Sequence, residues 1–312
     1  PGRAGPFCLC RTAFCIPFEV FPPGLSIPKS RSFRASEPEN FVSSPLRGTP
    51  EFRCESFPAM KKFRYLLPAL LLLATAACHD RADDRYDVFL LIGQSNMAGR
   101  GTMVPADTMG VMQGVWLLDT EGQPVPAKSP LNRYSSIRKQ IGMQQVCPGN
   151  GFAETLRAAT GRRILLVVNA RGGSALDEWL KGTHYYAEAV RRTREAMKHG
   201  SLRAILWHQG ESDSAHPETY LPRLAAMVDS LRRDLGCGEV PFIAGETARW
   251  REATAGINAA IHRIGDAIPA SDWVSSEGCT QLADDADPHF SRDGQLLLGR
   301  RYAEKVMEMC YE

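Results

Sequence analysis

Two short segments that lie far apart in the sequence carry a hydroxyl and an imidazole that could act together in acyl transfer. Ser95 lies within Gly93-Gln94-Ser95-Asn96-Met97-Ala98-Gly99, directly after an apolar run, and the flanking glycines allow a sharp turn that exposes the hydroxyl. His289 follows the acidic stretch 284–287, and a neighbouring carboxylate can hold an imidazole in the tautomer that a general base requires. For Ser95 the alternative is a polar turn that caps a helix, since Met97 breaks the Gly-x-Ser-x-Gly pattern. For His289 the alternative is a surface position in a solvated acidic loop.

Two further polar groups could complete such a site. The paired glycines in Ala170-Arg171-Gly172-Gly173-Ser174 could direct backbone N–H groups toward an oxyanion. The segment His208-Gln209-Gly210-Glu211-Ser212-Asp213 brings an amide and two carboxylates together after another apolar run. Taken alone, the first group is equally typical of a tight turn between a strand and a helix.

All of these groups adjoin predicted regular elements. Strands are expected at 86–93, 114–119, 163–169, 203–208, 240–245 and 272–275, and helices at 152–159, 185–198, 218–235, 253–268 and 291–309. The continuously apolar run 164–168 is typical of a parallel strand covered on both faces. The alternation predicts a single three-layer α/β/α domain with a mostly parallel central sheet. Ligands of such sheets bind beyond the carboxyl ends of the strands, where these polar groups fall.

Together these blocks resemble the sialate O-acetylesterase/acetylxylan esterase group of the SGNH hydrolase superfamily, the sixth carbohydrate esterase family. The resemblance spans residues 87–303 and depends on 93–99, 172–174 with Trp179, 207–213 and 289–290. It implies a flavodoxin-like fold and an esterase that removes acetyl groups from sugar hydroxyls, of the acetylxylan or sialic acid type, without a metal or cofactor.

Position by position, the resemblance implies that Ser95 is the nucleophile and that His289 is its base. It implies an oxyanion hole made by the backbone N–H groups of Ser95 and of Gly172 or Gly173, together with the side chain of Gln209. The residues expected to face the sugar, with core packing as the alternative for several of them, are Asn96, Arg171, Trp179 and Trp207.

The acid that orients His289 is left open by the sequence. The superfamily usually places an Asp three residues before the His, and Ala286 stands there. Asp285 and Asp287 flank that position, and Glu211 belongs to a block that helps to form the site. The sequence favours Asp287 narrowly over Glu211.

The first part of the chain differs from the rest in charge and composition. Residues 1–78 hold 10 Lys and Arg against 5 Asp and Glu, whereas residues 79–312 hold 27 against 30. Residues 1–59, with 10 of the 21 prolines, are interpreted as untranslated upstream sequence or, alternatively, as a disordered extension. Residues 60–78 have the parts of an export signal, and their end resembles a bacterial lipobox with Cys78 as the lipidated residue.

These features predict a polar tether at 79–85 and an esterase domain at 86–312. The mature protein is expected to be a periplasmic or cell-surface lipoprotein, or a secreted protein if the signal is cleaved without lipidation. Contact with a membrane is expected only through the lipid on Cys78, because no apolar run reaches the ~18–20 residues of a mature spanning helix.

The composition excludes other classes of protein. A net charge of +2 does not indicate a basic surface that binds nucleic acid, and 44% apolar residues are too many for a disordered chain. The expected partner is an acetylated oligo- or polysaccharide. Two other function classes remain open: a non-catalytic glycan-binding lipoprotein, and a lipid-directed esterase or thioesterase of the same superfamily.

Four cysteines of the predicted domain allow three complete pairings. Cys147 precedes a helix and Cys279 follows a strand, which predicts both at the edge of the sheet that carries the site. Cys237 and Cys310 follow helix ends and are expected at the opposite edge. The hypothesis is that Cys147 pairs with Cys279 and Cys237 with Cys310, with four free thiols as the alternative.

Overall fold

The computed structural model describes residues 85–311, which contain a seven-stranded sheet in the order β3-β2-β4-β1-β5-β6-β7. The predicted leader segments at 1–59 and 60–78, Cys78 included, and residues 79–84 of the tether lie outside the described residues. They stay predictions.

Neighbouring strands run parallel except for β2 and β3, which are antiparallel. In register, Phe89 of β1 lies opposite Leu166 of β4 on one side and Ala204 of β5 on the other. The strands are β1 (Tyr86–Gly93), β2 (Val115–Leu118), β3 (Pro124–Pro126), β4 (Ile164–Val168), β5 (Gly200–His208), β6 (Phe242–Gly245) and β7 (Ser271–Val274).

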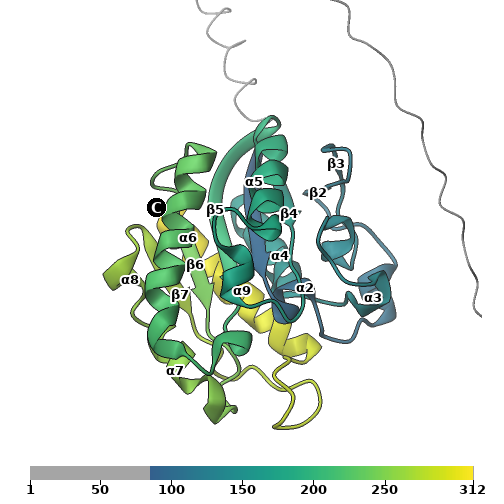
Figure 1. Cartoon of the computed structure of the whole chain (residues 1–312). Helices are drawn as coiled ribbons and strands as arrows, with labels where there is room; N and C mark the ends of the chain where they lie inside the picture. The colour runs from purple at the N-terminus through teal and green to yellow at the C-terminus, as the bar shows by residue number, and fades with distance from the viewer. Residues whose placement is uncertain (1–84, 312) are drawn as a thin grey trace, which may run out of the picture. The chain divides into compact units, whose positions relative to one another are not determined.

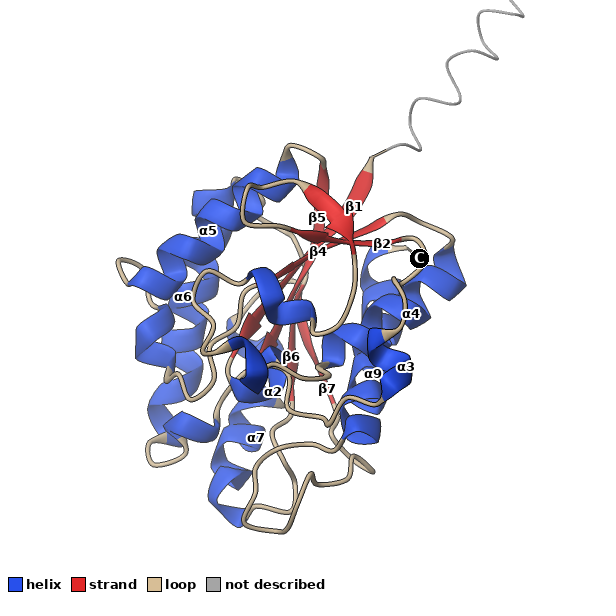
Figure 2. Cartoon of the chain, turned by 90° about the vertical axis from the view of Figure 1, so that its right-hand side faces the viewer, coloured by secondary structure: helices blue, strands red, loops and turns tan. Residues whose placement is uncertain are grey.

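Helices cover both faces of this sheet, as the continuously apolar strands require (Figure 1, Figure 2). Val88, Leu90 and Ile92 of β1 belong to a buried cluster with α5 (His184–Met197), α6 (Tyr220–Leu235), α7 (Ala255–Ile261) and α8 (Ile264–Ala267). Phe89 and Leu91 face the other way, into a cluster with α2 (Ser95–Ala98), α4 (Pro148–Thr160) and α9 (Arg292–Cys310). The predicted three-layer α/β/α architecture is confirmed.

The remaining helical segments are short and lie in the connections. They are α3 (Pro105–Thr108) and the 3₁₀ turns at Leu131–Tyr134, Ile141–Met143, Leu176–Trp179, Glu211–Asp213, Pro217–Thr219 and Glu252–Thr254. Among the described residues, no helix is both long enough and apolar enough to span a bilayer.

Three elements differ from the sequence-based expectation. The helix expected at 253–268 is divided into α7 and α8, and the break falls at His262 and Arg263, where the His262 side chain bonds Glu246. Strand β3 was not expected, because it is short and a proline stands at each of its ends. Helix α4 begins at Pro148, before the apolar pattern that predicts it, since Pro suits the first turn of a helix.

The four cysteines among the described residues are free. Cys147 and Cys279 belong to one buried cluster, whereas Cys237 and Cys310 line a single groove of about 390 Å³. The structure therefore separates the cysteines into the two expected groups without forming either predicted bond.

Candidate active site

A serine, a histidine and an aspartate form a continuous hydrogen-bonded chain where β1 meets the loop before α9. Ser95 Oγ lies 3.0 Å from Nε2 of His289. On the other side of the imidazole, Nδ1 lies 2.6 Å from Oδ1 of Asp287. Because a carboxylate only accepts, Nδ1 carries the hydrogen and Nε2 is left to accept from the Ser95 hydroxyl.

The turn after β1 exposes Ser95 because Gly93 ends the strand. Gly93 has a φ of +137°, and a Cβ at this position would collide with the backbone carbonyl of His208 at the end of β5. Ser95 is the first residue of α2 and starts directly beyond this close crossing of two strand ends. The glycine thus permits the sharp turn that the sequence indicated.

The loop before α9 holds His289 by its backbone on both sides. Leu282 N donates to the carbonyl of His289 at 2.8 Å, and Ser291 N donates to the carbonyl of Thr280 at 2.8 Å. The Ser291 hydroxyl accepts from Gly294 N at 3.1 Å and caps α9. His289 is therefore fixed just outside the helix start.

Asp287 is the carboxylate that contacts the imidazole. Its Oδ1 also accepts from the backbone N–H of His289 at 2.9 Å, so an Asp two positions before the His reaches the ring. Asp285 instead accepts from the side chain of Gln281, and Glu211 accepts from Asn96. Of the three acids that the sequence left open, only Asp287 makes a hydrogen bond to His289.

Three backbone N–H groups beside Ser95 are free to stabilise an oxyanion. The N–H groups of Ser95, Gly172 and Gly173 make no hydrogen bond within residues 85–311. A Cβ at position 172 would lie 3.7 Å from Cα of Ser95 and would collide with the Arg100 guanidinium, so the loop after β4 approaches Ser95 closely. Donors fixed in this way need no reorganisation when negative charge develops.

Ser95 and His289 line a pocket of about 400 Å³. Three cations, Arg100, Lys139 and Arg251, line the same pocket, and none of them forms an ion pair with any residue that the structure describes. Burial lowers the pKa of Arg100, and the nearby Asp287 opposes that change. The pocket therefore offers positive charge next to the nucleophile.

Gln209 does not take the position that the resemblance implied. Its side chain is fully buried, and Nε2 donates to the carbonyl of Ser174 at 3.1 Å and to Oδ2 of Asp213 at 2.5 Å. Because both contacts lie inside the protein, the amide has no donor left for an oxyanion in the pocket. The predicted role of Gln209 in the oxyanion hole is corrected to a role in the architecture of the loop after β5.

The four residues expected to face the sugar do not line the pocket either. Asn96 is 0% exposed, and Trp179 and Trp207 are core residues in edge-to-face contact at 5.6 Å between ring centroids. Trp179 donates its N–H to Ser174 Oγ and Trp207 to the hydroxyl of Tyr220, which satisfies the polar group of each buried indole. Arg171 donates to the carbonyl of Ile137.

Sequence reasoning missed several residues that line the pocket beside Ser95 and His289. Gln94 carried a signal, because it stands next to Ser95, and its Oε1 accepts from Gly210 N at 3.3 Å. Arg100, Lys139 and Arg251 carried none, since they lie in loops without a motif and come together only in the folded chain.

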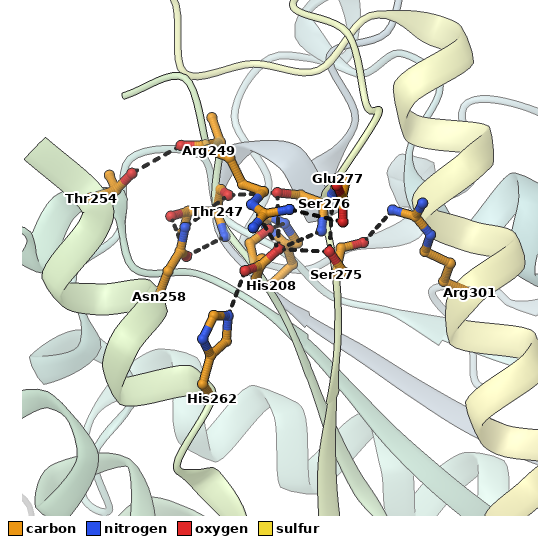
Figure 3. A network of polar contacts seen from close by, with 12 residues as sticks. His208, Thr247, Arg249, Thr254, Asn258, His262, Ser275, Ser276, Glu277 and Arg301 are labelled. Atoms are coloured by element: carbon orange, nitrogen blue, oxygen red, sulfur yellow. Dashed lines mark hydrogen bonds and ion pairs between the residues drawn. The ribbon is translucent and has the colours of Figure 1, made fainter. Parts of the chain in front are cut away.

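A second polar network lies between β6, β7 and α7 (Figure 3). Glu246 is 1% exposed and lies 2.5 Å from Nε2 of His262, and its other carboxylate oxygen accepts from Ser276 N at 2.7 Å. Burial raises the pKa of Glu246, but its hydrogen bonds outweigh this and hold the pKa below the usual value. This carboxylate is satisfied within the protein and has no contact with the pocket.

Nothing within residues 85–311 forms a group of three or more His, Cys, Asp or Glu side chains that could hold a metal ion.

Comparison with known proteins agrees with this fold and identifies the family of the chain. Residues 85–308 match the family of carbohydrate esterases described as sialic acid-specific acetylesterases, and the chain belongs to this family. Membership supports an esterase that removes acetyl groups and an acetylated carbohydrate as the substrate, and it confirms the resemblance read from the sequence.

Individual relatives support the same assignment. The chain is 30% identical over 246 residues to the probable carbohydrate esterase At4g34215 of Arabidopsis thaliana, covering 70% of this chain and 90% of the relative. The solved structure of that protein superimposes with a TM-score of 0.64 at 26% identity, covering 72% of this chain and 98% of the other. The structure of NanS shares the fold, with a TM-score of 0.58 at 19% identity over 72% of this chain and 98% of that one.

Proposed function

We propose that this protein is a serine hydrolase that removes acetyl groups from carbohydrate hydroxyls through an acyl-enzyme. The observation that carries the proposal is the convergence of Ser95 Oγ on His289 Nε2 at 3.0 Å, with Asp287 on the far side of the imidazole. A hydroxyl activated by an imidazole, which a carboxylate orients in turn, is the arrangement that nucleophilic acyl transfer needs.

In the first step, Ser95 Oγ attacks the ester carbonyl while Nε2 of His289 takes the hydroxyl proton. The carbonyl oxygen becomes an oxyanion and receives hydrogen bonds from the backbone N–H groups of Ser95 and of Gly172 or Gly173. As the tetrahedral intermediate collapses, the bond to the sugar oxygen breaks, and His289 returns its proton to that oxygen. The sugar alcohol leaves, and the acetyl group stays on Ser95.

In the second step, water replaces the sugar. His289 takes a proton from the water, whose oxygen attacks the acetyl-serine carbonyl, and the same N–H groups hold the second oxyanion. Collapse of this intermediate breaks the bond to Ser95 Oγ, which recovers its proton from His289, and acetate leaves.

The charge of the pocket favours an acidic sugar over a neutral one. Arg100, Lys139 and Arg251 line the pocket without an ion pair among the described residues, whereas Glu211 is the one acidic side chain in the same lining. A sugar carboxylate would meet this excess of cations. A sialic acid type of substrate is thus supported over acetylxylan, which carries no carboxylate on its xylose units.

Turnover of p-nitrophenyl acetate by the full-length protein tests the mechanism. Ser95→Ala and His289→Ala should each lower kcat/KM by about 10³-fold or more. Ser201→Ala and His216→Ala, which change exposed residues of the same types that do not line the pocket, are the controls. Turnover that survives Ser95→Ala would reject Ser95 as the nucleophile, whereas a wild type without turnover would leave the non-catalytic glycan-binding alternative.

Acetate release from O-acetylated sialic acid and from acetylxylan tests the substrate class. Faster release from the acidic sugar is expected, and a preference for xylan would contradict the role given to the three cations. Preference for an octanoyl ester over an acetyl ester would instead support the lipid-directed alternative, in disagreement with the polar character of this pocket.

A further inference from the structure

Asn96, the residue directly after Ser95, uses every hydrogen-bonding group of its side chain inside the protein. Its Nδ2 donates to Oε1 of Glu211 at 2.8 Å and to the carbonyl of Pro288 at 3.1 Å. Its Oδ1 accepts from the backbone N–H of Phe290 at 3.2 Å and from Nε2 of Gln295 at 3.0 Å. One fully buried amide thus joins the nucleophile turn to the loop after β5, the histidine loop and α9.

Two of these four bonds flank His289. The carbonyl of Pro288 and the N–H of Phe290 belong to the residues on either side of the histidine, so Asn96 hydrogen-bonds the backbone both before and after His289. Because Asn96 is covalently attached to Ser95, these two hydrogen bonds set the position of the His289 imidazole relative to the Ser95 hydroxyl. A misplacement of about 1 Å between reacting groups can cost 10²-fold in rate.

Glu211 is a half-buried residue whose carboxyl the proposed mechanism does not use. Oε1 accepts from Asn96, whereas Oε2 is buried and has no hydrogen-bond partner within residues 85–311. Burial raises the pKa of Glu211, and the hydrogen bond from Asn96 opposes part of this rise. In either protonation state Oε1 can accept, so Glu211 holds the NH₂ end of the Asn96 amide and leaves its oxygen for Phe290.

We propose that Asn96 and Glu211 form a clamp that positions His289 over Ser95, with Asn96 as the residue that holds the histidine loop and Glu211 as the residue that fixes its amide. The proposal rests on the proposed function, because it assigns how that Ser–His pair is held. We treat both as positioning residues: Asn96 does not line the pocket, and although Glu211 does, the only side-chain hydrogen bond that Glu211 makes within residues 85–311 goes to Asn96.

Steady-state kinetics of Asn96→Ala with p-nitrophenyl acetate provide the first test. We expect kcat to fall by about 10²-fold with KM within about 3-fold of the wild type, because only the alignment of the catalytic groups is lost. Asn258→Ala is the matched control: Asn258 is also a buried amide with several hydrogen bonds, all of them to Thr247 in the separate network of Figure 3. This control should lose stability while keeping kcat.

A pair of Glu211 variants separates positioning from bulk structure and covers the case in which Asn96→Ala does not fold. Glu211→Gln keeps an oxygen that can accept from Asn96 and should stay within about 5-fold of the wild-type kcat. Glu211→Ala leaves the Asn96 donor unpaired and should lose about 10–100-fold, again without a change in KM.

Several outcomes would overturn the clamp. An unchanged kcat in Asn96→Ala or in Glu211→Ala would do so, and so would a rise in KM at constant kcat, which would indicate substrate binding. Equal losses in Glu211→Gln and Glu211→Ala would also contradict it. Failure of the proposed function is distinguishable, since Ser95→Ala would then keep its activity, whereas failure of the clamp alone leaves Ser95 essential.

Discussion

Replacement of Asp287 by Asn tests whether this residue is the acid of the site. Asn keeps the shape of the side chain, but its NH₂ group can face Nδ1 of His289 and hold the imidazole in the wrong tautomer. In buried triads this change costs about 10⁴-fold in kcat. Here the side chains of Asp287 and His289 are 21% and 25% exposed, so water screens the pair and can partly replace the lost contact.

We therefore expect a smaller loss of about 10²–10³-fold in kcat/KM, which corresponds to about 3–4 kcal/mol of transition-state stabilisation. The assay is hydrolysis of p-nitrophenyl acetate by Asp287→Asn beside Asp285→Asn. The second variant changes an exposed residue of the same loop, whose carboxylate accepts a hydrogen bond from Gln281 and none from His289, and it should keep the wild-type rate.

Activity of Asp287→Asn within about 3-fold of the wild type would refute the assignment. If Glu211→Gln then lost 10²-fold or more, Glu211 would be the acid, and the pairing of Asp287 with His289 at 2.6 Å would be unimportant for catalysis. Equal melting temperatures of the variants are required, so that lost activity is not caused by unfolding.

Three further predictions concern the pocket and the fold. Lys139→Gln should raise KM for an O-acetylated acidic sugar about 5-fold, because a partly exposed ion pair between Lys139 and the sugar carboxylate contributes about 1 kcal/mol to binding. The same variant should leave p-nitrophenyl acetate turnover unchanged. Gly173→Ala should lower kcat by about 10²-fold in the same assay, because Gly173 has a φ of +77°, which an L residue rarely adopts, so alanine strains the turn and displaces an oxyanion donor; an unchanged kcat would remove residue 173 from the oxyanion hole. Asp87→Asn should cost about 3 kcal/mol of unfolding free energy in urea titrations, because Asp87 is 1% exposed and accepts hydrogen bonds from Arg162, Arg203 and Tyr311. Burial raises the pKa of Asp87, but the hydrogen bonds from these partners outweigh burial and hold the pKa below its usual value. The wild type should therefore lose stability as the pH falls below about 4, and the Asp87→Asn variant should lack this part of the acid transition.

The sequence alone was sufficient for the layers of the fold and for the principal residues of the site. Continuously apolar strands can be stable only when both faces are covered, so a run such as Ile164–Val168 indicates a parallel sheet between helices. Parallel strands also bring their carboxyl ends to one edge, which is why Ser95 and the loop after β5 could be expected together. The family motifs then identified Ser95 and His289 as the candidates for catalysis, and the structure places these two residues in contact.

Only the tertiary structure decided which way the side chains around Ser95 and His289 point. Gln209 and Asn96 stand beside the site in sequence, yet both amides turn into the protein, because Asp213 and Glu211 accept from them there. Arg100 and Lys139 carry no motif and reach the pocket from separate loops. The direction of a side chain at a strand end depends on backbone torsions and on partners that are distant in the chain, and no local pattern of residue types encodes those partners.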